Sequence, residues 1–480
     1  MDLDYSLLIP EIILGLTAIG VTLVDTFRRE LKVTPTALAG LAALGAIAAL
    51  VASLFYLDRS EDFGGLIAID NFTAFFRILL TGVLVVVIIG SYEFVERNIR
   101  NVGEFYALLL LSTVGGIFMA SAQELLTAYL SIELLSFSLY VAVSLAKSDI
   151  RSGEAGLKYV LLGGVASAML LYGLSLIYGT AGSTTYSEIA TAFSGGIADF
   201  ELAVLIGLAL IVGGLGFKAS AVPFHMWTPD AYEGAPLPIT AYLSATSKAA
   251  TFGLLLRVFS GPLLPLIDDW RWMLASMSVA TMVLGNLVAL QQHNIKRLLA
   301  YSSIGQVGFM LMAFVALSSD SSSALLLHLA GYLITNLAVF MAVIAFYNRT
   351  GREDIADFRG LAETQPYLAL VITVGLFSLS GMPLLAGFAT KFMLFQSVAS
   401  EGYLWLATVA VVMSTVSLYY YLQVIRQMYL YEPTGDASRW RLSPASYGIT
   451  GILSLTVVVL GIYFGPLFEA ADRATRVLFT

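Results

Sequence analysis

The chain has 480 residues, of which 58% are hydrophobic and 12% charged, and its formal net charge is −8. Soluble domains carry about 25% charged residues, so this composition argues against a water-soluble protein, and the negative balance argues against nucleic-acid binding. The absence of cysteine excludes disulfides, thiolate-held iron–sulfur clusters and cysteine-based zinc sites. The three histidines (His225, His293 and His328) lack the spacing of a haem or metal site, so we expect no redox centre in this chain.

Apolar stretches long enough to cross a hydrocarbon layer of about 30 Å recur along the chain. The acidic start, Met1-Asp-Leu-Asp-Tyr5, lacks the positive region of a signal peptide, so the first stretch is expected to be a retained helix. We predict an all-α, polytopic bundle of about fourteen transmembrane helices, at residues 7–26, 34–57, 72–91, 105–121, 124–146, 155–179, 201–226, 237–260, 271–291, 297–318, 322–347, 367–399, 403–429 and 446–469.

Basic residues are unevenly shared between the predicted loops. Fifteen of the 25 lysines and arginines follow odd-numbered helices, whereas four follow even-numbered helices or lie at the C-terminus. Because cytoplasmic loops carry the excess of lysine and arginine, the odd loops are predicted to be cytoplasmic and both termini to lie outside. All five tryptophans fall near predicted helix ends, as expected for interfacial aromatic belts.

Four ionisable residues lie near the centres of predicted helices: Glu133, Lys218, Lys248 and Lys391. Each costs about 2.5–3.5 kcal/mol on insertion scales, which favours a functional interpretation over snorkelling or a structural ion pair. Burial favours a neutral lysine and a nearby carboxylate favours a charged one. A change in the distance of Glu133 could therefore switch Lys218 or Lys248 between its charged and neutral forms. Lysine binds metal cations poorly, so the pattern favours proton transfer over sodium binding.

Further polar residues extend this set. Lys158, one turn after Glu154, lies nearer the cytoplasmic side, and His328 lies toward the outer side of the eleventh helix. Arg77 and Arg257 lie close to helix ends, where snorkelling or a structural ion pair is the simpler interpretation.

Two predicted helices combine glycine, proline and lysine at membrane depth. The seventh contains Lys218 and Pro223, and the twelfth contains Pro383 and Lys391; Pro236 precedes the eighth. Proline removes a backbone donor and kinks a helix, and the freed carbonyls can line a polar cavity.

The two broken helices are five helices apart, which predicts an inverted repeat, because an odd number of helices reverses the second copy. The repeats are helices 4–8 and helices 9–13. We divide the chain into an N-terminal three-helix segment (1–104), two five-helix repeats (105–260 and 261–429) and a C-terminal helix (430–480).

Three runs resemble the antiporter-like subunits of respiratory complex I, the NADH–quinone oxidoreductase. They are FKASAVPFHMWTPDAYEGAPLPITAYLSATSKA at 217–249, KRLLAYSSIGQ at 296–306 and GMPLLAGFATK at 381–391. The resemblance covers nearly the whole chain. Lys391, the opening Pro10-Glu-Ile-Ile-Leu-Gly15 and the short C-terminus resemble the subunit N branch, the counterpart of mitochondrial subunit 2, rather than the M or L branches.

The resemblance implies roles for single residues. Glu133 would be the fifth-helix carboxylate, Lys218 and Lys248 the seventh- and eighth-helix lysines, and Lys391 the outlet-side lysine, while Lys158 and His225 fall on inlet or axis positions. It also implies a proton-translocating subunit of a bacterial inner (plasma) membrane complex, packed against a neighbouring antiporter-like subunit and the small membrane subunits leading to the quinone site. NADH, FMN, iron–sulfur clusters and quinone would be used by other subunits.

Three alternatives remain open at this point. The same motifs occur in a photosynthetic NDH complex of the thylakoid membrane and in multi-subunit cation/proton antiporters. A stand-alone solute transporter is a further alternative, but it predicts a central cavity with varied hydrogen-bonding residues, whereas this chain offers lysines, one central carboxylate and mostly apolar neighbours.

Overall fold

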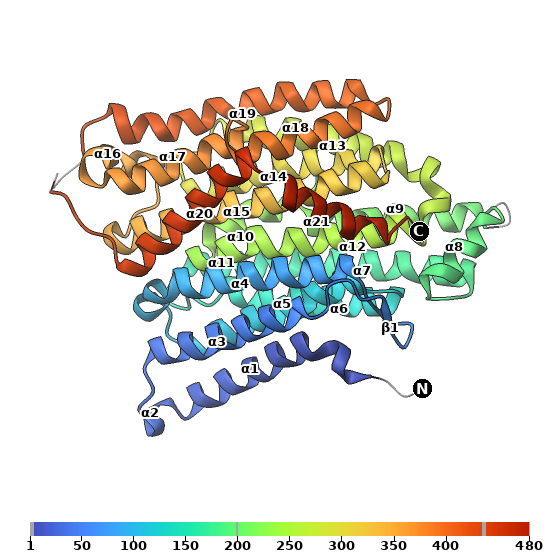
Figure 1. Ribbon diagram of the computed structural model, residues 1–480, viewed down its shortest axis with the longest axis horizontal. Helices are drawn as coiled ribbons and strands as arrows, with labels where there is room; N and C mark the ends of the chain where they lie inside the picture. Colours follow the sequence, from blue (N-terminus) through green and yellow to red (C-terminus); the bar gives the residue numbers. More distant parts are fainter. Residues whose placement is uncertain (1–3, 198–199, 434–437, 480) are drawn as a thin grey trace.

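The computed structural model describes residues 4–197, 200–433 and 438–479. Most helices run along one long axis, and both ends of the chain lie at the same end of the bundle (Figure 1). The short helices α2 (Arg28–Leu31) and α16 (Leu361–Thr364), which belong to predicted odd loops, lie at the opposite end (Figure 1). The predicted crossing pattern, with an even number of passes, is therefore consistent with the structure.

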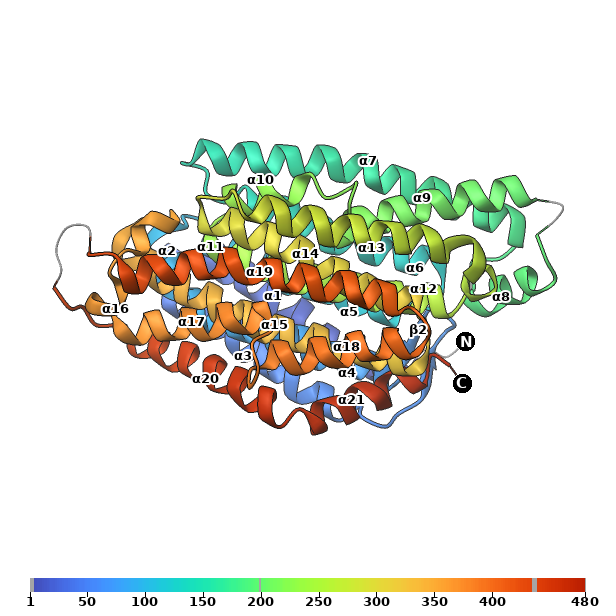
Figure 2. The same ribbon diagram turned by 90° about the horizontal axis from the view of Figure 1, so that it is seen from above.

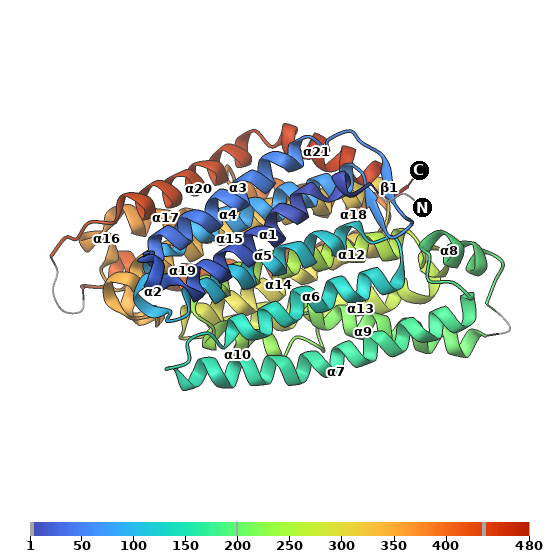
Figure 3. The ribbon, with the colours of Figure 1, turned by 90° about the horizontal axis from the view of Figure 1, so that it is seen from below.

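Among the described residues, twelve helices are long and apolar enough to cross a membrane. They are α1 (Ile9–Thr26), α3 (Pro35–Leu54), α4 (Asn71–Asn98), α5 (Val102–Ser121), α6 (Leu125–Val143), α7 (Ile150–Ala181), α9 (Glu201–Ala219), α13 (Ile267–Ala289), α14 (Ile295–Val315), α15 (Ser319–Thr350), α19 (Leu404–Leu430) and α20 (Pro444–Ile462). Figures 2 and 3 place α7 and α20 at opposite edges of the bundle.

The two remaining predicted crossings are interrupted helices, which brings the bundle to about fourteen passes. The eighth consists of α11 (Leu237–Tyr242), a π-helical turn (Leu243–Ser247) and α12 (Lys248–Ser260). The twelfth consists of α17 (Pro366–Ser380) and α18 (Ala386–Ser400). The predicted breaks in the seventh and twelfth helices are confirmed.

The seventh crossing extends beyond its predicted span, and the fourteenth is interrupted where a single span was predicted. In the seventh, α9 ends and a second helix, α10 (Trp227–Gly234), follows after a break. In the fourteenth, α20 ends and α21 (Gly465–Arg476) follows. The fourteenth is interrupted at Tyr463 and Phe464, shortly before Pro466, which cannot continue the hydrogen bonds of α20.

Short elements complete the ends of the bundle. A two-stranded antiparallel hairpin, β1 (Glu61–Phe63) and β2 (Ile67–Ile69), joins α3 to α4, and α8 (Tyr186–Ser194) joins α7 to α9. Among the described residues, three 3₁₀ turns occupy Tyr5–Leu8, Leu264–Leu266 and Ile355–Phe358.

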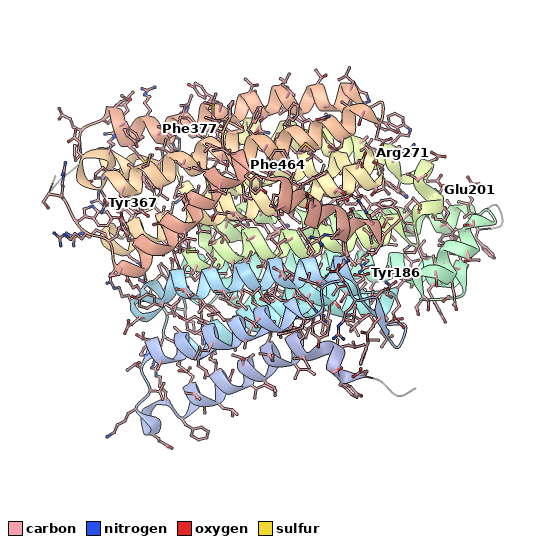
Figure 4. All side chains as sticks on the ribbon, viewed as in Figure 1. Tyr186, Glu201, Arg271, Tyr367, Phe377 and Phe464 are labelled. Atoms are coloured by element: carbon pink, nitrogen blue, oxygen red, sulfur yellow. The ribbon has the colours of Figure 1, made fainter. Side chains whose placement is uncertain are left out.

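The two repeats run in opposite directions. Glu201, at the start of α9, and Tyr367, at the start of α17, lie at opposite ends of the molecule (Figure 4). The repeats also share local sequence: AYLSIELLSF at 128–137 in α6 is matched by AYSSIGQVGF at 300–309 in α14. The inverted repeat predicted from the odd helix count is therefore confirmed.

Two buried ion pairs join the N-terminal helices to each other and to the first repeat. Arg77 on α4 donates to Glu11 on α1 at 2.7 Å, and neither side chain is more than 3% exposed. Arg257 on α12 donates from Nη2 to both carboxylate oxygens of Asp70, each at 2.7 Å, and from Nε to the carbonyl of Ala120 at 2.9 Å. Both arginines thus belong to the structural ion pairs considered above, and neither snorkels.

We predict that Arg257→Ala destabilises the protein by about 3–5 kcal/mol, because removing one partner leaves the Asp70 carboxylate buried without its cation. Arg59→Ala is the matched control. It breaks the pair of Arg59 with Glu61 at 3.2 Å in the nearby hairpin, whose side chains are 44% and 42% exposed, and should cost about 0–1 kcal/mol. Thermal unfolding of both variants in detergent provides the comparison, and equal losses would contradict this assignment.

Candidate functional site

The break between α9 and α10 keeps its backbone groups paired inside the protein. The indole Nε1 of Trp227 donates to the carbonyl of Phe217 at 2.9 Å, and the backbone N–H of Val222 donates to Oγ1 of Thr281 on α13 at 2.9 Å. Ser220, at the end of α9, adopts the left-handed conformation with φ of 69°. Because hydrocarbon offers no partners to a freed backbone group, these contacts allow the helix to stop at membrane depth.

Lys218 lies in the last turn of α9 and is 2% exposed. Its Nζ donates to the hydroxyl of Ser136 and, at 3.1 Å, to the hydroxyl of Tyr140, both on α6. The same Nζ lies 5.1 Å from the centre of the Tyr140 ring. The ammonium is therefore held by neutral groups of the fifth crossing.

Glu133 lies one turn before Ser136 on α6 and accepts a hydrogen bond from the hydroxyl of Ser167 on α7. Among the described residues, no salt bridge within 4.0 Å joins it to a lysine. Glu133 is half-buried, and its neighbours Leu130 and Phe137 are 58% and 60% exposed. The carboxylate therefore lies at the surface of this chain at membrane depth, close to Lys218 but bonded to a hydroxyl.

Lys248 begins α12 immediately after the π-helical turn and is 1% exposed. Its Nζ donates to the hydroxyl of Tyr232 on α10 at 2.7 Å. Pro236 lies between these two elements, at the start of α11. The break after α9 thus places the Tyr232 hydroxyl against the lysine of the next crossing.

Lys391 uses the break between α17 and α18 differently. Its Nζ donates to the carbonyl of Leu379 in the last turn of α17 at 2.7 Å and to Oγ of Ser414 on α19 at 3.1 Å. The hydroxyl of Ser414 in turn donates to the carbonyl of Ser380 at 2.9 Å. Carbonyls freed where α17 stops, before Pro383, therefore hold the lysine.

A cavity of about 270 Å³ adjoins Lys391 between α18 and α19. The half-exposed rings of Phe388 and Phe392 line it, together with Ser414 and Met382. The lysine thus lies at the base of a mostly apolar cavity near one face of this chain.

The two candidate histidines, His328 and His225, lie in different parts of the site. His328 on α15 is 2% exposed, and its Nδ1 lies 3.0 Å from Oγ1 of Thr390, the neighbour of Lys391 in the chain. His225 lies in the α9–α10 break, two residues after Pro223, and its buried Nδ1 has no hydrogen-bond partner among the described residues. His328 therefore joins the Lys391 region and His225 joins the first break.

Lys158 belongs to an ion network at the odd-loop end of the bundle. Its Nζ lies 2.7 Å from Glu154 and 3.0 Å from Asp230, and Asp230 also pairs with Arg297 on α14 at 2.9 Å. Arg297 contacts Glu233 at 2.7 Å. A cavity of about 170 Å³ opens beside Lys158, Glu154 and Asp230. This candidate is exposed and lies apart from the buried lysines.

Buried hydroxyls lie between Lys248 and the second repeat. The Tyr232 hydroxyl that accepts from Lys248 lies next to Ser303 and Tyr332. The Tyr332 hydroxyl donates to Oγ of Ser303 at 2.9 Å, and the hydroxyl of the neighbouring Ser302 is hydrogen-bonded to the hydroxyl of Tyr421 on α19. These contacts lead from α10 to α14, α15 and α19.

An amide completes the connection to Lys391. Gln306 lies next to Tyr421, and its Nε2 donates at 3.1 Å to the carbonyl of Leu379, the same oxygen that accepts from Lys391. Polar side chains of α10, α14, α15 and α19 therefore lie between Lys248 and Lys391 in the centre of the bundle.

Sequence reasoning missed these hydroxyl and amide partners, because serine and tyrosine are common in any helix. Two signals could have found part of the set. Ser136 follows Glu133 by three residues and so shares its helix face, and Tyr232 lies within the run Thr228–Gly234 that carries the family resemblance.

The fold and site together define a class of protein: a polytopic, antiporter-like membrane subunit with inverted repeats and lysines at membrane depth. The chain belongs to the family described as NADH:quinone oxidoreductase/Mrp antiporter, transmembrane, whose model matches residues 122–417. A curated relative from Moorella thermoacetica, named NADH-quinone oxidoreductase subunit N, is 41% identical over 479 residues, which cover 99% of this chain and 98% of that relative.

Solved structures agree with this assignment. A chain of "Respiratory complex I from Thermus thermophilus with bound Aureothin" has a TM-score of 0.80 and 30% identity, covering 97% of this chain and 99% of that one. A chain of the Mrp complex from Dietzia sp. DQ12-45-1b has a TM-score of 0.86 and 22% identity, covering 100% and 98%. At that lower identity the likeness shows the fold alone.

Proposed function

We propose that this chain translocates protons across the membrane as one subunit of an NADH–quinone oxidoreductase, driven by quinone reduction in other subunits. One observation carries the proposal: Lys218, Lys248 and Lys391 are buried, and their Nζ atoms are held by hydroxyl or carbonyl oxygens. A hydroxyl can accept from an ammonium and donate to a neutral amine, whereas a carboxylate partner would hold the lysine charged. Such lysines can take up and release protons.

The source of energy lies outside this chain. Moving one charge across the membrane costs about 2.3 kcal/mol per 100 mV, and the chain has no cysteine to hold an iron–sulfur cluster. The curated relatives are named as subunits of NADH-quinone oxidoreductase. NADH, FMN, iron–sulfur clusters and quinone are accordingly assigned to other subunits of the complex, and this chain contributes translocation to the translocase.

The series of polar side chains gives the proposed direction of transfer within the membrane. A proton on Lys248 passes to Tyr232 as Tyr232 releases its own proton toward Ser303. Gln306 and Lys391 both donate to the carbonyl of Leu379, so Gln306 positions this end of the series and carries no proton itself. The cavity beside Lys391 then lies on the outlet side. Glu133, one turn before Ser136 on α6, biases the charge of Lys218, which donates to Ser136.

The basic odd-loop end is assigned to the cytoplasm of a bacterial cell, with both termini outside, on the charge bias of the loops. The exposed network around Lys158 and Asp230 then lies at the cytoplasmic surface. Its cavity of about 170 Å³ is the inlet in this proposal.

We predict that Lys218→Ala abolishes proton pumping and strongly reduces coupled quinone reduction while the complex still assembles, because the first buried carrier is removed. Lys147→Ala, at a loop lysine that is 68% exposed, is the matched control and should pump as wild type. Pumping by the reconstituted complex in proteoliposomes is the measurement. Wild-type pumping by Lys218→Ala would remove this residue from the path.

A second prediction concerns the charge of Glu133. Glu133→Gln retains an oxygen that can accept from Ser167 but loses the charge, whereas Glu133→Asp retains the charge on a shorter side chain. Protons pumped per electron should therefore fall further in Glu133→Gln than in Glu133→Asp. If the two variants rank the other way, geometry rather than charge at this position sets the rate.

A third prediction separates the hydroxyl of Tyr232 from its ring. Tyr232→Phe removes the only hydrogen-bond acceptor that Lys248 has among the described side chains and should lower pumping by about 100-fold or more, since a positioned proton-transfer group contributes about 10²- to 10⁴-fold. Tyr242→Phe is the control on α11, since this equally buried hydroxyl contacts Ser112 and Thr113 instead. Similar effects of both variants on pumping per assembled complex would argue against a relay.

A further inference from the structure

The C-terminal crossing touches the break between α17 and α18 at one residue. Gly461 lies in the last turn of α20, and a Cβ atom placed there would lie 2.3 Å from the carbonyl oxygen of Leu384, 2.5 Å from its carbonyl carbon and 2.5 Å from that of Leu385. These are backbone atoms, which cannot rotate away as a flexible side chain can. The close approach of α20 to the break therefore requires glycine at 461.

The backbone that Gly461 touches is itself unusual. Leu384 has φ of 69°, in the left-handed region that non-glycine residues rarely adopt. Its side chain is 71% exposed, so its own packing does little to hold this conformation. Conformations of this kind persist only where the surrounding structure imposes them. The backbone of α20 at Gly461 lies against the Leu384 carbonyl and so restrains this conformation.

A displacement at Leu384 is passed directly to Lys391. Helix α18 begins at Ala386, two residues later, and its first turn is tightly packed against α17: Gly387 donates from its backbone N–H to Oγ of Ser378 at 3.0 Å. Lys391 is one turn further along α18, but its two partners lie on α17 and α19. Moving α18 relative to α17 therefore changes the hydrogen bonds of the Lys391 Nζ.

The first break has a comparable support from the helix that follows its repeat. Thr281 on α13 accepts from the backbone of Val222, and Met277 on α13 lies against Gly216. The second repeat is followed by α20, whose Gly461 contacts Leu384. Each break is thus held by the first crossing that comes after its own repeat.

We propose that α20 is a positioning element for Lys391, acting through the contact of Gly461 with the backbone of 384–385. Gly461 is a positioning residue, since it touches no group that carries a proton. In Figure 4 the labelled Phe464 marks the junction of α20 with α21, three residues beyond this contact. The inference rests on the proposed role of Lys391 in proton transfer, and its test separates the two.

The test uses the whole complex with Gly461→Ala, and with Gly448→Ala as the matched control. Gly448 lies on the same helix, but a Cβ there meets nothing within 4 Å. A misplacement of about 1 Å at a reacting group can cost about 100-fold in rate. We therefore expect protons pumped per electron to fall by about 10-fold in Gly461→Ala and to stay at the wild-type value in Gly448→Ala.

A second readout reports the position of the break without using pumping. Because the chain has no cysteine, Met382→Cys places a single thiol of this chain beside Lys391, in the cavity that Met382 lines. Labelling by a membrane-permeant maleimide, read as the mass of this chain, should be faster when Gly461→Ala displaces the break. Leu384→Gly, which accepts the left-handed conformation freely, should partly rescue both pumping and labelling.

Fewer protons pumped per electron in Gly461→Ala, together with altered labelling and rescue by Leu384→Gly, supports the positioning role. Wild-type labelling in Gly461→Ala, or a loss confined to the amount of assembled complex with a normal ratio of protons to electrons, overturns it. Altered labelling in a complex whose Lys391→Ala variant still pumps normally would leave the positioning role standing and refute the proposed function of Lys391.

Discussion

Freed backbone carbonyls at membrane depth must find donors inside the protein, because the hydrocarbon supplies none. The rest of the site depends on this constraint. At the first break the indole of Trp227 and the backbone N–H of Ser220 satisfy the carbonyl of Phe217. At the second, the carbonyl of Leu379 is satisfied by Lys391 and Gln306. Burying a lysine costs free energy elsewhere in the bundle, but where a helix stops the lysine supplies a donor to a freed carbonyl.

The inverted repeats share their fold but distribute ionisable groups differently. In the aligned runs of α6 and α14, Gly305 stands where the first repeat has Glu133. Lys391 is the sixth residue of α18, and the sixth residue of α10 is Tyr232, the hydroxyl partner of Lys248. In each repeat the half-helix after the break therefore contacts the following crossing through one lysine and one hydroxyl. In the first repeat the half-helix carries the hydroxyl and the next crossing the lysine, and in the second repeat the half-helix carries the lysine. In each pair the hydroxyl can accept from the charged lysine or donate to the neutral one.

Much of the fold could be predicted from the sequence, since long apolar runs and the loop charges are strong signals. The interruptions at Pro223 and Pro383 and the buried lysines were also visible as residues at a predicted depth. The sequence could not show that Glu133 bonds to Ser167, because that contact depends on how α6 lies against α7. The hydroxyl and amide connection through Tyr232 and Gln306 depends in the same way on packing across the two repeats, and no spacing along the chain reveals it.

The pair of Asp70 with Arg257 has a consequence for biosynthesis. The two residues are separated by 187 positions, so the ribosome completes Asp70 and the fourth to seventh crossings long before Arg257 emerges. Until then the Asp70 carboxylate, at the N-cap of α4, has no cation to receive it and can remain at the water boundary. The amino-terminal helices can therefore reach their final packing only after the eighth crossing has been inserted. Packing at the start of the chain is thus completed by a residue near its middle.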